Sequence, residues 1–415
     1  MPPPVVNPRQ QATEPWVAGT TWTGGQYSLA RALFGAWLFA GFVRLLPWDP
    51  AWIAAAGEHA AGFGRSLVRL VPNVLSWSAE PWVGTALLLA GAVASLSFAV
   101  GAWHRVAAGV VAYAWLCVWR AAPSLPTPGM PWILGLLLAH FTLPPAPYGS
   151  WTARGRADPE GGWRIHLPVF QLAWALLLLA SVMGVFEKLS SGAWRSGGEL
   201  AARGVALPAS ALQLVAWLGI AVEAALPIAV FRKRPRAIAW SAALAWRLLV
   251  LTLGGADERL RGLLVAHLLA FDPLWLPPLR ASAREHLFFD GTCGLCHRIV
   301  RFVAAEDRGS AFFYSPLEGE TIRGLLTDAQ RAALPDSVVV RTDRGQLVLR
   351  SDAWIHVLRR LGGAWRAFGA LLAVVPRPIR DVLYLLVART RRLFFARPKE
   401  SCPLLSTRLR GYFLP

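Results

Sequence analysis

Two cysteines separated by two residues are the part of this sequence best suited to chemistry. Cys293 and Cys296 belong to the run Asp290-Gly-Thr-Cys-Gly-Leu-Cys, which ends at Cys296. Residues 285–289 before it form an apolar run typical of a strand, and apolar residues recur at helical spacing through residues 297–305. The pattern therefore predicts a strand, a turn and a helix, with the second cysteine in the first helical turn. Unpaired backbone N–H groups and the positive end of the helix dipole favour a thiolate there.

This placement predicts thiol–disulfide exchange, because the thiolate is the nucleophile of that reaction. We expect Cys293 to attack a disulfide and Cys296 to release the product from the mixed disulfide. Asp290 and Gly291 form the turn that exposes the first sulfur. Such exchange needs no metal and no cofactor, and its partner would be a redox protein or a small thiol.

Other interpretations of these cysteines stay open. A zinc site lacks its second half, because the chain has 4 cysteines and no other close Cys/His pair. Cys293 to His297 matches the Cys-x-x-Cys-His pattern of covalent haem attachment, although the strand–turn–helix flanks favour a redox domain. Two structural thiols, or a dithiol that captures a soft metal ion, are further alternatives. Cys117 lies in an apolar run and is given no role, and Cys402 is interpreted as structural rather than exchanging.

Several segments of the C-terminal region together form a specific pattern: Phe289 to Cys296, Glu306 to Arg308, Asp336 to Val340, Arg350 to Ala353, Leu361 to Gly363, Pro376 to Pro378, Tyr384, and Cys402-Pro403 with Arg408, Arg410 and Phe413. Through these segments residues 284–415 resemble the DCC family of thiol–disulfide oxidoreductases. The resemblance implies a small thioredoxin-like α/β domain with a redox role. In thioredoxin-like proteins a cis-proline before a strand faces the dithiol, and Pro335 is the matching candidate.

Further elements of this domain follow from local patterns. Residues 335–341 and 346–349 flank an Asp-Arg-Gly turn and predict a hairpin. A helix is expected from Ser351 or Asp352, its N-cap, to the glycines at 362–363.

Two apolar helices are expected over 365–375 and 380–395, the second with Arg389, Arg391 and Arg392. They suit either docking on anionic lipid headgroups or packing on the domain's own sheet.

The composition of the 415-residue chain indicates a membrane protein. Hydrophobic residues make up 55% and charged residues only 16%, and the net charge of +18 comes almost wholly from arginine. Such a basic excess fits cytoplasmic loops and lipid-facing surfaces. No stacked-aromatic RNA motif or basic DNA-reading helix is visible, so we expect no nucleic-acid partner.

The apolar runs predict a polytopic α-helical membrane domain at residues 27–280, after a disordered lead at 1–26. About eight spans are expected, at residues 27–46, 82–103, 106–119, 131–143, 167–186, 209–231, 237–253 and 263–279. Residues 51–75 have a helical pattern with several charges and are better placed at the membrane interface.

The basic loop Arg232 to Arg236 predicts the topology. If this loop lies on the cytoplasmic side of a bacterial-type plasma membrane, both the N-terminus and the thiol domain lie on that side as well. The resting form in that reducing compartment would be the dithiol.

Ionisable residues within or at the ends of spans are candidates for a second site. They are Glu187, Lys188, Glu223, Arg247 and His267, and Glu223 and Arg247 are spaced to pair between consecutive spans.

Gln171, Gly184 to Lys188, Trp194 and the glycines 197–198 resemble the membrane region of vitamin K-dependent carboxylase and its horizontally transferred transmembrane relatives. A similar likeness exists to small DoxX-type quinone-linked membrane proteins. These likenesses imply that Lys188 acts as a base and that the membrane domain binds a quinone or lipid. The alternative function is a carboxylase-like membrane enzyme or transporter, with the thiol domain as its redox regulator or electron donor.

Overall fold

The computed structural model describes residues 22–49, 51, 71–78, 80–121, 130–154, 163, 165–254, 258–335, 337–394 and 407–415. The chain divides into two compact units. The helical unit is formed within residues 30–145 and 165–271, and the C-terminal unit combines residues 272–415 with 146–164 and 21–29. Residues 52–70 of the predicted interfacial segment 51–75 lie outside the described residues.

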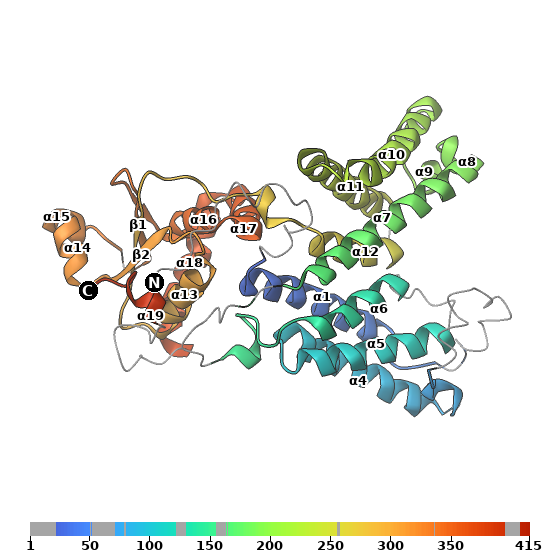
Figure 1. The fold of residues 1–415 in the computed structure, drawn as a ribbon, viewed down its shortest axis with the longest axis horizontal. Coiled ribbons are helices and arrows are strands. Elements are labelled where there is room, and N and C mark those ends of the chain that lie inside the picture. Colours follow the sequence, from blue (N-terminus) through green and yellow to red (C-terminus); the bar gives the residue numbers. More distant parts are fainter. Residues whose placement is uncertain are drawn as a thin grey trace. The chain divides into compact units, whose positions relative to one another are not determined.

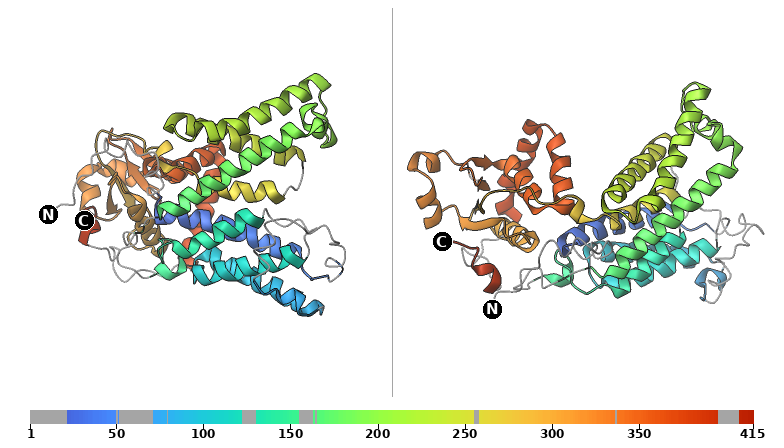
Figure 2. Two further views of the ribbon diagram at one scale, coloured as in Figure 1. Left: turned by 45° about the vertical axis from the view of Figure 1, so that its right-hand side comes forward. Right: turned by 45° about the horizontal axis from the view of Figure 1, so that its top comes forward.

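The helical unit consists of helices that pack on one another, some of them distant in the chain. Their bounds are α1 Gly24–Arg44 (its first turns belong to the C-terminal unit), α4 Pro81–Val100, α5 His104–Ala121, α6 Met130–Ala139, α7 Leu167–Ser190, α8 Gly192–Arg195, α9 Gly198–Ala202, α10 Ala209–Ala229, α11 Lys233–Gly254 and α12 Glu258–Leu269. Helix α4 packs on α5, α7 on both α10 and α12, and α10 on α11. Figures 1 and 2 show α10 and α11 running side by side.

Three described helices, α4, α7 and α10, are long and apolar enough to cross a membrane. They match three of the predicted spans, and they indicate a membrane protein. The predicted total of about eight is not confirmed. Helix α6 has 10 residues, and α11 includes Lys233, Arg234, Arg236 and Arg247.

Two predicted boundaries are wrong. The span expected at 263–279 ends as a helix at Leu269, because Asp272 caps a 3₁₀ turn that begins at Pro273. The disordered lead expected at 1–26 extends too far, since Trp22 and Gln26 are buried and α1 begins at Gly24.

The C-terminal unit contains a four-stranded sheet in the order β2-β1-β3-β4. Its elements are β1 Glu285–Phe289, α13 Gly294–Glu306, β2 Phe312–Pro316, α14 Glu320–Leu325, α15 Asp328–Ala332, β3 Val339–Arg341, β4 Leu347–Leu349, α16 Arg350–Leu361, α17 Gly363–Val374, α18 Arg377–Phe394 and α19 Thr407–Arg410. Strand β1 runs parallel to β2, joined through α13, and antiparallel to β3. Figure 1 shows the strands beside α13 and α16.

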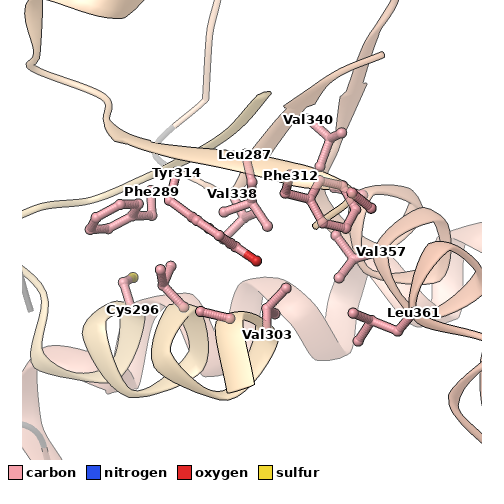
Figure 3. Packing of buried hydrophobic residues seen from close by; sticks show 14 of the residues in the cluster. Leu287, Phe289, Cys296, Val303, Phe312, Tyr314, Val338, Val340, Val357 and Leu361 are labelled. Atoms are coloured by element: carbon pink, nitrogen blue, oxygen red, sulfur yellow. The ribbon is translucent and has the colours of Figure 1, made fainter. Parts of the chain in front are cut away.

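Strand β1 is buried on both faces, as expected for a central strand. Leu287 and Phe289 face α13 and α16, whereas Phe288 packs with Ile322 of α14 on the other face. Figure 3 shows the first of these clusters, with Cys296 on its helix directed toward the side chains of the sheet.

Several local predictions for this unit are confirmed. The strand at 285–289, the helix after the dithiol, the hairpin with its Asp-Arg-Gly turn, and the two apolar helices after Gly362 are all present. The N-cap expected at Ser351 or Asp352 is wrong, because α16 begins at Arg350 after Leu349. Ser351 instead donates its hydroxyl hydrogen bond to the Asp381 carboxylate.

Candidate functional site

The turn before α13 is held by Asp290. Its Oδ1 atom accepts hydrogen bonds from the backbone N–H of Thr292, at 2.8 Å, and from the hydroxyl of Thr292, at 2.7 Å. The Asp290 carbonyl accepts the N–H of Cys293 at 3.3 Å. This turn, built by one side chain on its own backbone, presents Cys293 as the N-cap residue of α13.

The two sulfurs lie together at the start of the helix. Cys296 falls in the first turn, which confirms the sequence prediction, and its backbone N–H points at the Cys293 sulfur at 3.4 Å. The sulfurs and a carboxylate oxygen of Asp290 all lie within 4.8 Å of one another. Both cysteines are free thiols and both are buried, with exposed fractions of 3% and 4%. The backbone N–H of Cys296 donates to the Cys293 sulfur, and the second thiol is near enough to form a disulfide after a small movement.

Pro335 does not have the predicted cis bond. Among the described residues the cis peptide bond is Leu46–Pro47, so the bond before Pro335 is trans. Its carbonyl accepts the N–H of Ser337 at 2.7 Å, in the connection between α15 and β3. From this connection it is Val338, not Pro335, that packs with both cysteines in the core cluster. Trans geometry is the default for proline in a turn.

The environment of His297 does not suit haem attachment. Its Nε2 atom lies 3.0 Å from the carbonyl oxygen of Gly291, and its ring is buried edge-on against Phe289. The nitrogen that would bind iron is therefore already engaged with the backbone.

Asp290, Cys293 and Cys296 are a group that offers three donors to a metal ion. A structural zinc site takes four ligands, and the Asp290 carboxylate is already engaged with Thr292. The donor set fits a closed zinc site poorly.

Four of the five predicted membrane-domain residues, from α7, α10 and α11, line one cavity of about 450 Å³, whereas His267 of α12 is not among its lining residues. Lys188 of α7 and Glu223 of α10 form an ion pair at 2.6 Å, with both side chains mostly buried. Glu187 and Arg247 line the same cavity. Arg247 of α11 does not take the expected place beside Glu223 in this pair. It donates to Ser181 at 2.9 Å and lies 2.9 Å from the His267 ring.

Aromatic rings complete this cavity. Trp132, Trp194 and Trp246 line it, and the Lys188 ammonium lies 5.2 Å from the centre of the Trp194 ring. The arrangement combines fixed charges with flat apolar walls, which is how sites for small molecules are usually built.

Sequence reasoning missed a buried carboxylate at the far end of α13. Glu306 accepts hydrogen bonds from the Gly25 N–H at 2.9 Å, the Trp365 indole N–H at 2.6 Å and the Thr23 hydroxyl. Burial raises the pKa of this carboxyl above its usual value, although the three donors oppose the rise. Its partners lie 281 and 59 residues away in sequence, so no local pattern identifies them.

Comparisons with known proteins agree on the C-terminal region. Residues 287–397 match a family model described as DCC1-like thiol-disulfide oxidoreductase. The uncharacterized protein YuxK of Bacillus subtilis is 38% identical over 133 residues, which cover 31% of this chain and 93% of the relative. A DCC family protein of the Arabidopsis thaliana chloroplast is 31% identical over 121 residues, covering 29% of this chain and 70% of the relative. No solved structure matches the chain significantly.

Proposed function

Because the chain belongs to the DCC1-like thiol-disulfide oxidoreductase family, we propose that its C-terminal unit catalyses membrane-associated thiol–disulfide exchange through Cys293 and Cys296. The observation that carries the proposal is the backbone N–H of Cys296 directed at the Cys293 sulfur, with the second thiol beside it. The strand order supports a thioredoxin-like domain, since a βαβ unit is followed by an antiparallel hairpin and a helix.

The reaction proceeds in two displacements. The Cys293 thiolate attacks one sulfur of a substrate disulfide, the other substrate sulfur leaves as a thiolate, and a mixed disulfide forms. Cys296 then attacks the Cys293 sulfur and releases the second substrate thiol. The protein dithiol is oxidised to a disulfide while the substrate gains two electrons and two protons. The Asp290 carboxylate, within 4.8 Å of both sulfurs, is placed to accept the Cys296 proton.

The basic segment Arg232 to Arg236, at the start of α11, supports a cytoplasmic C-terminal unit, in which the dithiol is the resting form. Membrane lipids are then its surroundings, and a protein or small thiol renews the dithiol.

The test is a redox titration of the purified full chain in detergent, with alkylation of each cysteine read by mass spectrometry. We expect one reversible two-electron transition confined to Cys293 and Cys296, with a midpoint in the range of thioredoxin-type or glutaredoxin-type dithiols. Cys293→Ser should abolish it. Sulfurs that never pair, or that stay masked by a metal ion, would refute the proposal.

A second proposal concerns the helical unit. The cavity around the Lys188–Glu223 pair supports a carboxylase-like membrane enzyme or transporter, with Lys188 as base and a quinone or lipid as ligand. Lys188→Ala separates the two proposals, because exchange at Cys293 should be untouched while any turnover in the cavity should be lost. Redox titration of the Lys188→Ala variant measures exchange at Cys293, and binding of a short-chain quinone to the same variant measures the cavity.

A further inference from the structure

A cavity of about 350 Å³ lies within the C-terminal unit against the dithiol. Cys296 and Ile299 of α13 form one wall, Trp354 of α16 another, and Leu383 and Tyr384 of α18 a third. Cys293 is not among the lining residues. The size is that of a pocket for a small organic molecule.

The surface of this cavity is almost wholly carbon, because its few polar side chains are already hydrogen-bonded to other protein groups. Ser351 donates to Asp381, and Arg380 donates to Asp352 at 2.9 Å. The Tyr384 hydroxyl accepts the N–H of Val338 at 3.1 Å. A charged or strongly polar ligand would lose its hydration here without finding partners.

The cavity is reached along an apolar helix face. Leu383 and Val387 of α18 line it and are also 57% and 54% exposed, so they lie at its rim. Val382 and Leu386 beside them are exposed to a similar degree and continue the apolar surface outward. Apolar molecules therefore meet an apolar surface that continues into the cavity lined by Cys296.

We infer that the dithiol acts on a low-molecular-weight disulfide with an apolar substituent, which this cavity binds. The inference rests on the proposed function and names its substrate class. The apolar group R of R–S–S–R′ enters beside Cys296, which brings its sulfur within reach of Cys293, since the two protein sulfurs lie within 4.8 Å. Cys293 attacks that sulfur and R′S⁻ leaves; Cys296 then closes the protein disulfide and RS⁻ leaves. The two protons of the dithiol pass to the two products.

Two disulfides of equal length test the inference. Di-n-propyl disulfide and bis(2-hydroxyethyl) disulfide differ only by a methyl group in place of a hydroxyl at each end. The full chain, reduced and in detergent, is mixed with each, and oxidation of Cys293 and Cys296 is followed by alkylation and mass spectrometry. We expect the propyl compound to react roughly tenfold faster, as apolar pockets discriminate by one or two such groups.

Variants distinguish binding of the propyl compound in the cavity from its partitioning into the detergent. Ala388 lines the cavity, and Ala388→Phe should slow the propyl compound roughly tenfold while changing the hydroxyethyl rate less than about twofold. Leu385→Phe adds an aromatic ring on the same helix at an exposed position that does not line the cavity, and both rates should stay unchanged. Should Ala388→Phe fail to fold, Val387→Ser at the rim should lower the propyl rate roughly threefold.

The outcomes are distinct. If neither disulfide oxidises the dithiol, the proposed function is wrong. If both do so at similar rates, or if the propyl preference survives Ala388→Phe and Val387→Ser, exchange stands and the cavity inference is overturned. Equal slowing of both disulfides by Ala388→Phe also overturns it, since the cavity would then control access without selecting apolar groups.

Discussion

The two candidate sites are built in opposite ways. Asp290, Cys293 and Cys296 are neighbours in sequence, and the turn and first helical turn that position them are local. Lys188 and Glu223 belong to different helices and meet only when α7 packs on α10. The cavity beside Cys296 is lined almost wholly by carbon, whereas the cavity around Lys188 and Glu223 is lined by charged and aromatic groups. A reactive pair of thiols needs local geometry, whereas a buried ion pair needs tertiary packing to become tolerable.

The largest effect should come from breaking the membrane ion pair. Glu223→Ala leaves the Lys188 ammonium, 13% exposed, without its carboxylate, and we expect a loss of about 3 kcal/mol in the stability of the helical unit. Hydrogen exchange of peptides from α7 and α10 in detergent measures it. The double variant Lys188→Met with Glu223→Leu should recover most of the loss, because no charge is left unpaired.

The redox transition of Cys293 and Cys296 should keep its midpoint in Glu223→Ala. A shifted midpoint would contradict the independence of the two sites, because it would mean that they are energetically coupled.

The C-terminal unit has a buried carboxylate of its own, and removing it should cost slightly less. Glu306→Ala leaves the N–H of Gly25 and of Trp365 without an acceptor, and we expect a loss of about 2 kcal/mol. Thermal unfolding, followed by hydrogen exchange of peptides from β1 and α13, measures this loss of stability. Glu306→Gln, which keeps one acceptor oxygen, should lose less, and an equal loss in both variants would contradict the hydrogen-bond account.

Stability of this unit should also depend on pH through Glu306. Its folded pKa is raised by burial, so the folded state holds a proton that the unfolded state has lost. The associated stability is present below the unfolded pKa, near 4.5, and is lost as the pH rises through the folded pKa. Unfolding measured from pH 4 upward should show a decline in the natural chain that Glu306→Gln flattens. A parallel decline in both would refute the assignment.

The smallest effect should come from the hairpin between β3 and β4. Gly345 has φ of +77°, and a Cβ added there would meet the Arg341 Nη2 atom at 3.8 Å, an ordinary contact distance, so Gly345→Ala tests mainly backbone strain. We expect a loss of about 1 kcal/mol, and none for Gly309→Ala, where nothing lies within 4 Å and φ is not positive. Chemical denaturation, followed by hydrogen exchange of peptides from β3, measures the difference in stability between the two variants.

The sequence predicted best what one segment determines by itself. The strand before the dithiol, the position of Cys296 in the first helical turn and the helix end at Gly362 follow from spacing and turn residues. Strand β2 went unpredicted, because Phe312–Pro316 becomes a strand by pairing with β1 and with the tail near Phe413. The cavity walls at Trp354 and Tyr384 are equally non-local, since α16 and α18 reach Cys296 only through the fold.

In the membrane part, composition predicted apolar helices but not their number or pairing. Because of its charged residues, α11 is less apolar than the candidate spans α4, α7 and α10. The choice of Lys188 rather than Arg247 as the partner of Glu223 depends on how helices rotate against one another, which hydropathy does not record.

The hydrogen bond between Gly25 and Glu306 also bears on the order in which the chain can be assembled. During synthesis the first turn of α1 emerges 281 residues before the carboxylate that it binds. Trp365, which shares that carboxylate, follows 59 residues later still. The C-terminal unit therefore cannot close until nearly the whole chain has left the ribosome, and a contact of such long sequence separation forms late and slowly. A gene fragment that starts at residue 284 would encode the sheet and the dithiol but would leave Glu306 without the Gly25 N–H.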